Sequence, residues 1–245
     1  MILVFGGTTE GRKTITLLEQ AGIPYCYSTK SKLEIPPQTY GTYRHGPLTT
    51  TALQEFCASN DIRVIIHASH PFATILHQTI AAANLPVLRF EREYPARTIH
   101  PLVHYFDSYA EALDYLSIHP VKKLLALTGV QTISQLSKYW HTHETFFRIL
   151  PRESSLELAL STGFPQERLI SEMPGNEAAL IASHHITGIL TKESGESGLL
   201  SVKINAALAA GIPIFIITRP VLPAAFISVH EHNLLDHLKG YGVCL

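Results

Sequence analysis

The chain has 245 residues, of which 46% are hydrophobic and 16% are charged. Because globular proteins usually carry about 25% charged residues, this composition predicts one or two compact domains and excludes intrinsic disorder. The formal net charge of -1 excludes an overall basic field of the kind that gathers nucleic acid or anionic membrane. The best candidate for a membrane span, residues 212–218, is far shorter than the roughly 18 residues required, so we expect a soluble protein.

The N-terminus and the cysteines indicate where the protein works. Residues 2–5 enter a predicted strand at once, with no basic segment or cleavage-site pattern before them, so we expect an untargeted cytoplasmic protein. The cysteines are Cys26, Cys57 and Cys244, an odd number without a CxxC pair. This pattern indicates reduced, structural thiols rather than a disulfide framework.

Apolar periodicity alternates between strands and helices along the chain. The expected order begins with a strand at 2–5, a helix at 10–20, extended chain at 25–27, an irregular stretch around Pro36, Pro37, Gly41 and Gly46, a helix at 49–59, a strand at 63–68, a helix at 72–84 and a strand at 85–90. Thr49 or Thr50 is the expected cap of the second helix. Past Pro95 we expect helices at 108–119 and 132–140 and strands at 123–127, 145–149, 186–190 and 212–218.

Repeated strand and helix alternation is typical of parallel sheets that are covered by helices on both faces. We therefore predict an α/β fold of two Rossmann-like lobes, each a parallel sheet flanked by helices, with an active-site cleft between the lobes. The segment 94–98 marks the boundary. The expected domains are residues 1–97, an N-terminal nucleotide-binding-like domain, and residues 98–245, a C-terminal α/β domain.

The segment GGTTEGR, residues 6–12, lies between the first strand and the first helix. Glycines let the backbone turn tightly and approach a ligand, and a helix N-terminus presents N–H groups to a phosphate. The spacing is a variant of the dinucleotide-binding loop, and the alternative is an ordinary tight turn. The favoured interpretation is a nucleotide site, and its expected members are Gly6, Gly7, Thr8, Thr9, Glu10 and Arg12.

About 20 residues further on, a site selective for NAD usually carries an acidic residue for the ribose hydroxyls. Here the chain has Ser28, Lys30 and Lys32, with no carboxylate before Glu34. Hydroxyls and lysines suit a 2'-phosphate, so NADPH is the predicted cofactor and NADH the alternative. An ordinary solvated loop is the other interpretation of this stretch.

Two further motifs follow predicted strands of the first lobe, where open α/β sheets bind ligands. The first is HASHPFA, residues 67–73, in which Ser69 or His70 is alternatively a helix cap. His67 fits a buried supporting residue, and its spacing from His70 lacks the further ligands of a zinc site. The second is RFER, residues 89–92, whose arginines either bind substrate carboxylates or form surface ion pairs.

The second lobe has two comparable strand ends. Thr128 and Gly129 follow one strand, and Lys192, Glu193, Ser194 and Gly195 follow another. A cation, a carboxylate, a hydroxyl and a flexible turn in one loop indicate a ligand site, with a solvated loop as the alternative. The remaining histidines lack ligand spacing, so no protein-bound metal is expected.

The ordered set GGTTEGR (6–12), HASHPFA (67–73), RFER (89–92), TG (128–129), KESG (192–195), Lys203 and Arg219-Pro220 resembles the precorrin-6A reductase family over nearly the whole chain. The resemblance implies an oxidoreductase of cobalamin (vitamin B12) biosynthesis. It would use a nicotinamide, generally NADPH, to reduce one double bond of the precorrin-6A macrocycle or of its cobalt form. It also implies two α/β domains with cofactor and macrocycle between them.

The resemblance carries over to individual residues of this chain. Thr128 and Gly129 join the first glycine-rich loop as cofactor contacts. A proton must reach the reduced macrocycle, and the candidate donors are His70, Lys192 and Glu193. The residues expected to bind the substrate, with its many carboxylates, are Ser69, Phe72, Arg89, Arg92, Ser194, Gly195, Lys203 and Arg219. His67, Ser69 and Val130 depart from the family pattern, which often has Asp, Thr and a basic residue there.

Expected partners are the tetrapyrrole substrate and other enzymes of the cobalamin pathway, without nucleic acid or membrane. The alternative function is a non-catalytic protein that binds a nucleotide or an anionic ligand. A short-chain dehydrogenase is disfavoured because the chain has no Tyr-x-x-x-Lys pair.

Overall fold

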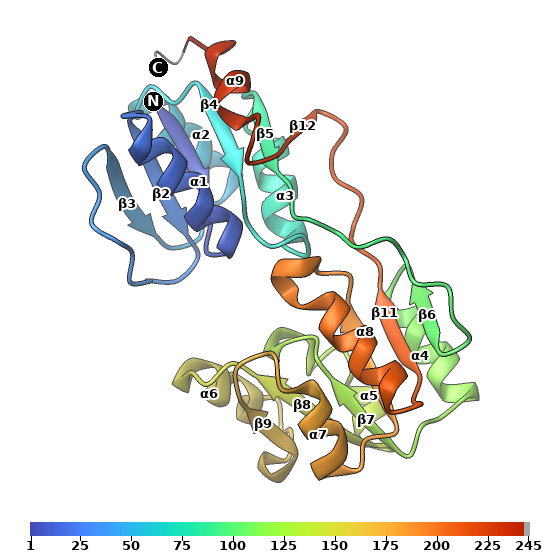
Figure 1. Cartoon of the computed structure of the whole chain (residues 1–245). Coiled ribbons are helices and arrows are strands. Elements are labelled where there is room, and N and C mark those ends of the chain that lie inside the picture. Colours follow the sequence, from blue (N-terminus) through green and yellow to red (C-terminus); the bar gives the residue numbers. More distant parts are fainter. Residues whose placement is uncertain (243–245) are drawn as a thin grey trace. The chain divides into compact units, whose positions relative to one another are not determined.

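The computed structural model describes residues 1–242, which form two compact units (Figure 1). Unit 1 combines residues 1–93 with the C-terminal segment from Pro220, and unit 2 comprises residues 94–219. Each unit is built on one six-stranded sheet whose strand pairs are all parallel. The predicted α/β fold with two parallel, helix-flanked sheets is confirmed. No helix within residues 1–242 has the length and apolar character for a bilayer crossing.

The sheet of unit 1 has the strand order β12-β5-β4-β1-β2-β3. Its strands are β1 (Ile2–Phe5), β2 (Tyr25–Thr29), β3 (Gly41–His45), β4 (Val64–His67), β5 (Val87–Phe90) and β12 (Phe226–Val229). Its helices are α1 (Thr9–Gln20), α2 (Thr50–Ser59), α3 (Thr74–Ala81) and α9 (Leu234–Lys239). The order runs outward from β1 in both directions, so the strand order reverses between β1 and β4.

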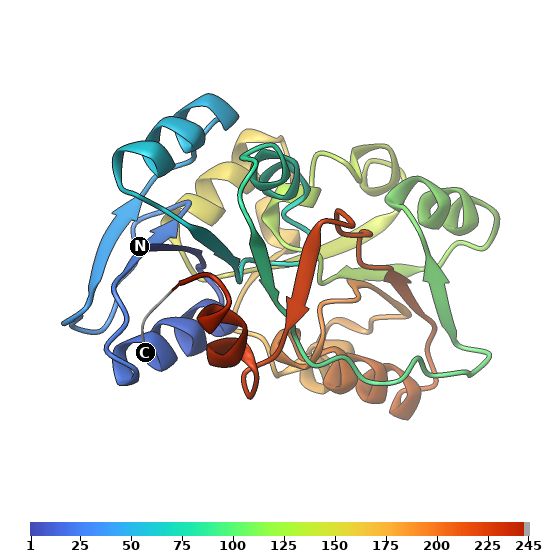
Figure 2. The ribbon, with the colours of Figure 1, turned by 90° about the horizontal axis from the view of Figure 1, so that it is seen from above.

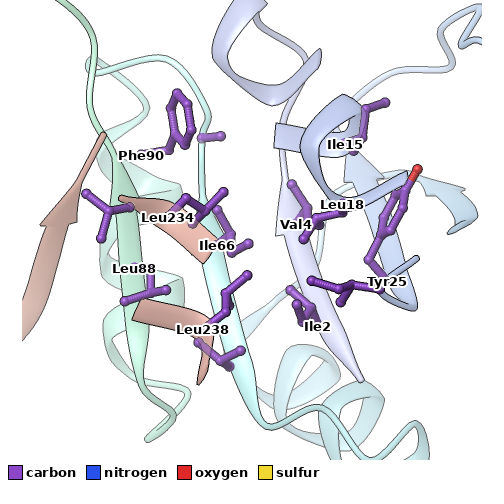
Figure 3. Packing of buried hydrophobic residues seen from close by; sticks show 14 of the residues in the cluster. Ile2, Val4, Ile15, Leu18, Tyr25, Ile66, Leu88, Phe90, Leu234 and Leu238 are labelled. Atoms are coloured by element: carbon purple, nitrogen blue, oxygen red, sulfur yellow. The ribbon is translucent and has the colours of Figure 1, made fainter. Parts of the chain in front are cut away.

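Alternate residues of each strand point to opposite faces, so the sheet of unit 1 supports two cores. One core joins α1 and α9 to Ile2, Val4, Ile66 and Leu88 (Figure 3). The other core joins α2 and α3 to Leu3, Phe5 and Ile65 on the opposite face, and Figure 2 shows these helix pairs on the two sides of the sheet. Leu234 and Leu238 of α9 are fully buried, and each buried leucine contributes roughly 1.5–3 kcal/mol. The C-terminal segment is therefore integral to unit 1.

The sheet of unit 2 has the strand order β6-β11-β10-β7-β8-β9. Its strands are β6 (Val103–Phe106), β7 (Lys123–Ala126), β8 (Glu144–Ile149), β9 (Leu169–Ser171), β10 (Gly188–Lys192) and β11 (Ile214–Ile217). Its helices are α4 (Tyr109–Ile118), α5 (Ser137–Trp140), α6 (Glu153–Ser161), α7 (Glu177–His184) and α8 (Leu200–Ala209). Three 3-10 turns, η1 (Val130–Thr132), η2 (Gln166–Arg168) and η3 (Glu196–Gly198), complete the unit. Leu125, Ile189 and Ile214 pack against α7 and α8 in its main core.

The structure adds elements that the periodicity does not reveal. The strands β3, β6, β9 and β12 and the helices α6, α7 and α9 were not expected, because these strands are short or partly exposed and these helices lack a strong apolar stripe. The helix expected at 132–140 is instead η1 followed by the short α5. The expected cap Thr49 is confirmed, since its Oγ1 accepts a hydrogen bond from the Ala52 N–H at 3.2 Å.

The division into units differs from the domains expected at 1–97 and 98–245. The chain first passes from unit 1 into unit 2 between Glu93 and Tyr94, close to the expected boundary. The C-terminal segment, however, returns to unit 1, because β12 pairs in parallel with β5 at the sheet edge. Val229 of β12 is fully buried in the same core as α1. Unit 2 is therefore an insertion within unit 1.

The two described cysteines, Cys26 and Cys57, are buried free thiols. They pack in the core between the unit 1 sheet and α2, and burial raises the pKa of both thiols. These residues match the expected reduced, structural thiols, whereas Cys244 lies outside the described residues.

Candidate functional site

The carboxyl ends of β1 and β4 mark the point in unit 1 where the strand order reverses, which is where open parallel sheets bind ligands. The loop after β1 carries the glycine-rich segment, and the loop after β4 carries Ser69 and His70. Thr8 joins the two loops. Its Oγ1 donates to the Ala68 carbonyl at 2.5 Å and accepts from the Gly11 N–H at 3.1 Å as the cap of α1.

Three glycines let this loop lie close to the sheet. A Cβ on Gly6 would overlap the ring of Tyr27, and a Cβ on Gly11 would lie 2.7 Å from the Cα of Gly6. Gly7 has φ +90, and its N–H donates to the Tyr27 hydroxyl at 2.9 Å. The loop therefore turns directly into the first turn of α1, whose N–H groups lack carbonyl partners within the helix and can receive an anion.

Glu10 and Arg92, expected at the cofactor and the substrate respectively, pair with each other. Arg92 Nη2 lies 3.0 Å from Glu10 Oε2, and both side chains are buried. This pair links α1 to the segment after β5. Thr9 and Arg12 are exposed, so Arg12 provides the positive charge beside the start of α1.

The end of β2 holds the residues expected to distinguish NADPH from NADH. Lys30 is exposed, but Ser28 is buried and its Oγ accepts a hydrogen bond from Arg44 Nη1 at 2.5 Å. Arg44 belongs to β3, in a stretch where the sequence indicated irregular chain. Arg44 comes to the end of β2 because β3 pairs with β2, and this long-range pairing could not be predicted from the local sequence.

His67 is the fully buried supporting residue that the sequence suggested. Its Nδ1 and the Ser69 Oγ are 3.0 Å apart, and burial, reinforced by the charge of Arg89, holds the pKa of His67 well below its usual range. Neither Ser69 nor His70 caps α3, contrary to that alternative, because the cap is Ala73. His70 Nδ1 instead accepts the Phe72 N–H at 3.2 Å, which fixes the turn between β4 and α3.

Arg89 lies inside unit 1 rather than at its surface. Its side chain is 1% exposed, and its Nη1 donates to the carbonyls of His67 and Ser69 at 3.1 and 2.9 Å. These bonds hold the end of β4 in place. Arg89 and Arg92 are both buried with partners inside unit 1, and their expected contact with the substrate stays a prediction.

The strand order of unit 2 reverses between β7 and β10. After β7, the hydroxyls of Thr128 and Thr132 are 2.6 Å apart, and Thr132 Oγ1 donates to the Gly129 carbonyl at 2.7 Å. Gly129 has φ +86. Only the three-residue η1 and the four-residue α5 follow, so this loop has no long helix start comparable with that of α1.

The loop after β10 places Lys192 and Glu193 at the same sheet edge. Lys192 is the last residue of β10, and burial lowers its pKa to about 8. Glu193 accepts hydrogen bonds from the Arg97 side chain at 3.1 and 3.3 Å and from the Arg219 N–H at 3.0 Å. Ser194 is buried, and its N–H donates to the Lys192 carbonyl at 2.7 Å.

The other expected substrate residues of unit 2 have separate surroundings. Gly195 has φ +72 and begins the turn into η3. Lys203 is buried on α8, and its Nζ donates to the Gly198 carbonyl at 2.7 Å. Arg219 is exposed, with its guanidinium carbon 3.7 Å from the centre of the Tyr94 ring. Gly195 and Arg219 therefore follow the carboxyl ends of β10 and β11, whereas Lys203 lies on α8.

Comparison with known proteins identifies the family. The family model of the precorrin-6x reductases CbiJ/CobK matches residues 1–238. The chain belongs to this family. A cobalt-precorrin-6A reductase of Synechocystis sp. is 31% identical, with 89% of this chain and 88% of the relative covered. One of Methanothermobacter thermautotrophicus is 29% identical, with 97% and 83% covered.

Relatives named precorrin-6A reductase and relatives named cobalt-precorrin-6A reductase are both similar to this chain. The precorrin-6A reductase of Rhodococcus erythropolis is 27% identical, with 94% of this chain and 93% of the relative covered. A solved structure, the CobK precorrin-6A reductase, superposes with a TM-score of 0.81 at 22% identity over 99% of this chain and 97% of that chain, which supports the fold. Membership of this reductase family makes the chain an oxidoreductase and implies a nicotinamide cofactor and a tetrapyrrole substrate.

Proposed function

We propose that this chain reduces one double bond of the precorrin-6A macrocycle, metal-free or carrying cobalt, with NADPH as the reductant. The observation that carries the proposal is the glycine-rich loop at the point of strand reversal in unit 1, in a chain whose family match spans residues 1–238. The relatives named for this reaction cover most of the chain.

The residues of unit 1 fit a dinucleotide. Side chains are absent where a pyrophosphate would approach, at Gly6 and Gly7, and the N-terminal turn of α1 offers N–H groups to it. Arg12 adds a positive charge at that helix start. A bound reduced nicotinamide would supply a hydride to a ring carbon of the macrocycle.

The preference for NADPH rests on charge at the end of β2. Between Tyr25 and Thr49 the chain carries Lys30, Lys32 and Arg44 against the single carboxylate Glu34. A carboxylate that would bind the 2'-hydroxyl of NADH is absent from the end of β2 itself. This surplus of positive charge favours a 2'-phosphate.

Lys192 is the proposed proton donor. A general acid works best when its pKa lies near the operating pH, and burial lowers the Lys192 pKa to about 8. Its ammonium form would give a proton to the carbon beside the one that receives the hydride. Glu193 is less suited, because its carboxylate oxygens already accept bonds from Arg97 and the Arg219 N–H.

Arg219 is the proposed contact for a substrate carboxylate. It is the one arginine of the expected substrate set that is exposed, since Arg89 and Arg92 are buried. Its stacking on Tyr94 orients the guanidinium while leaving its planar edge able to donate two parallel hydrogen bonds.

The direct test is anaerobic incubation of the full chain with metal-free precorrin-6A or its cobalt complex, each with NADPH or NADH. We expect loss of nicotinamide absorbance in step with a change of the macrocycle spectrum, with NADPH the better reductant. The arm that turns over identifies the metal state of the substrate. Saturable binding of nucleotide and macrocycle without turnover in any arm would replace this proposal with a non-catalytic binding protein.

A further inference from the structure

The strand β3 brings an arginine to the carboxyl edge of the unit 1 sheet. β3 pairs in parallel with β2, and the register sets Arg44 beside Ser28. Parallel strands end at the same sheet edge, so Arg44 stands next to the last residues of β2. Local sequence does not reveal this neighbour, because it depends on the pairing of two strands that are separated by an irregular loop.

The Arg44 side chain is held across the end of β2. Its Nη1 donates to Ser28 Oγ at 2.5 Å and its Nη2 donates to the Gly46 carbonyl at 3.0 Å. The guanidinium carbon lies 5.7 Å from the centre of the Phe56 ring. A guanidinium fixed on these sides loses little further freedom when it binds a ligand, because its orientation is already set.

The charge of Arg44 is uncompensated by acidic side chains. Within residues 1–242 it has no carboxylate within 4.0 Å, whereas Arg89, Arg92, Arg97 and Arg148 each have one. The side chain is only half-buried, so part of it is accessible to solvent. A preoriented, accessible cation without a protein counter-ion is suited to an anionic group of a ligand.

The position of Arg44 defines which anionic group that is. In sheets of this strand order, the end of the second strand lies beside the adenosine ribose of a bound dinucleotide. An acidic residue there binds the two ribose hydroxyls, whereas an arginine there accommodates a 2'-phosphate. The end of β2 has no acidic residue, and Arg44 is the arginine that the fold adds to it.

We infer that Arg44 is the residue that selects the 2'-phosphate, and with it NADPH over NADH. The inference rests on the proposed function and deepens it, because it replaces a general excess of positive charge with one forked donor. Lys30 adds attraction as an exposed point charge on a flexible stem, and the rigid fork of Arg44 supplies the geometric match to a phosphate.

The experiment compares two adenosine fragments by calorimetric titration of the full chain. One fragment, 2',5'-ADP, carries the 2'-phosphate, and the other, 5'-AMP, lacks it. The variant Arg44→Gln should weaken 2',5'-ADP by roughly 10–100-fold, the loss expected for a charged hydrogen-bonded pair. Binding of 5'-AMP should change less than about threefold.

The matched control is Arg63→Gln, which removes the same charge from the opposite edge of the same sheet. Arg63 precedes β4, is exposed and pairs only at 3.3 Å with Asp61. Its loss should leave both fragments within about twofold of the wild-type affinity. An equal effect of the two arginine variants would show that net charge alone accounts for binding and would overturn the assignment.

The remaining outcomes separate this inference from the proposed function. Equal weakening of both fragments by Arg44→Gln, or no weakening of either, overturns the role of Arg44 while wild-type turnover with NADPH keeps the proposed function. Wild-type protein that binds neither fragment overturns the role of Arg44, and only the absence of turnover with either nicotinamide removes the proposed function. If Arg44→Gln fails to fold, Arg44→Lys keeps the charge without the fork. It should then weaken 2',5'-ADP alone by about 3–10-fold, and unchanged binding overturns the inference.

Discussion

Units 1 and 2 share the order of five strands, β5-β4-β1-β2-β3 and β11-β10-β7-β8-β9, but the outer strand beside them is the last of unit 1 and the first of unit 2. The loops at the point where the order reverses also differ. In unit 1, β1 leads through three closely packed glycines into the twelve-residue α1, capped by Thr8. In unit 2, β7 leads through Gly129 into a 3-10 turn and a four-residue helix. Unit 2 carries the half-buried amine of Lys192 instead. A similar strand order therefore does not mean that the two units have the same function. The N-terminus of α1 favours unit 1 as the unit that binds phosphate.

The largest expected effect separates chemistry in unit 2 from binding in unit 1. Lys192→Met should lower kcat by roughly 10²–10⁴-fold, the usual contribution of a general acid. Because the donor must be protonated, wild-type activity should be flat below the Lys192 pKa of about 8 and fall tenfold per pH unit above it. Single-turnover kinetics over a pH series measures both.

The variant Lys192→Met should leave the affinity for 2',5'-ADP unchanged. Lys138→Met is the matched control, since Lys138 is an exposed residue of α5 in the same unit. If Lys192→Met loses nucleotide affinity and keeps the wild-type pH profile, Lys192 binds the cofactor and is not the proton donor. Nucleotide binding would then not be confined to unit 1.

The second effect concerns the two glycines that occupy corresponding loops. Gly6→Ala forces a methyl group into the Tyr27 ring, so we expect 2',5'-ADP affinity to fall by at least about tenfold as the loop moves. Gly129→Ala has open space and meets only the backbone cost of φ +86 and ψ 162, about 1–3 kcal/mol of stability. Calorimetric and thermal titration of both variants tests this, and a comparable loss of affinity in Gly129→Ala would reverse the roles of the two loops.

A third effect is the greater sensitivity of unit 1 to acid. Burial, followed by the charge of Arg89, lowers the pKa of His77 from 6.5 to about 4. The unfolded chain therefore binds more protons than the folded chain between these values, and stability falls as the pH drops from 6.5 towards 4. The expected loss is about 1–3 kcal/mol.

The single tryptophan makes this loss assignable to one unit. Trp140 is buried in unit 2, so its fluorescence reports on that unit, while far-ultraviolet circular dichroism reports on both. On acidification, dichroism should change before fluorescence, and His77→Leu should reduce the gap. Fluorescence that changes first would show that unit 2 is the weaker unit in acid.

The smallest expected effect concerns Glu193. Its partner Arg97 is 57% exposed, so the ion pair is worth less than about 1 kcal/mol. Glu193→Gln should leave kcat within about threefold of wild type, because the amide can still accept the Arg219 N–H. A drop in kcat of about a hundredfold or more would make Glu193 the proton donor in place of Lys192.

The features that depend on neighbouring residues are predictable from the sequence. The apolar runs of β1 and β4, the cap at Thr49 and the turn after β1 all follow from a few consecutive residues. Arg89 and Arg92 were expected at the surface, and they are buried because their partners come from distant parts of the chain, Glu10 in the case of Arg92.

The role inferred for Arg44 depends on a similar long-range contact. The residues of β3 are only partly buried, so they lack the alternation that marks a strand in the sequence. The C-terminal return to unit 1 is likewise invisible locally, because β12 has exposed residues and gains its place only by pairing with β5.

The insertion of unit 2 within unit 1 has a consequence for protein synthesis. A ribosome finishes residues 94–219 before it reaches β12 and α9, so the unit begun second is the first to be completed. Until then, β5 is an open sheet edge, and the pockets filled by Leu234 and Leu238 are vacant. A chain released early would contain a finished unit 2 and an unfinished unit 1. Only products that extend through α9 thus complete the unit that carries the glycine-rich loop.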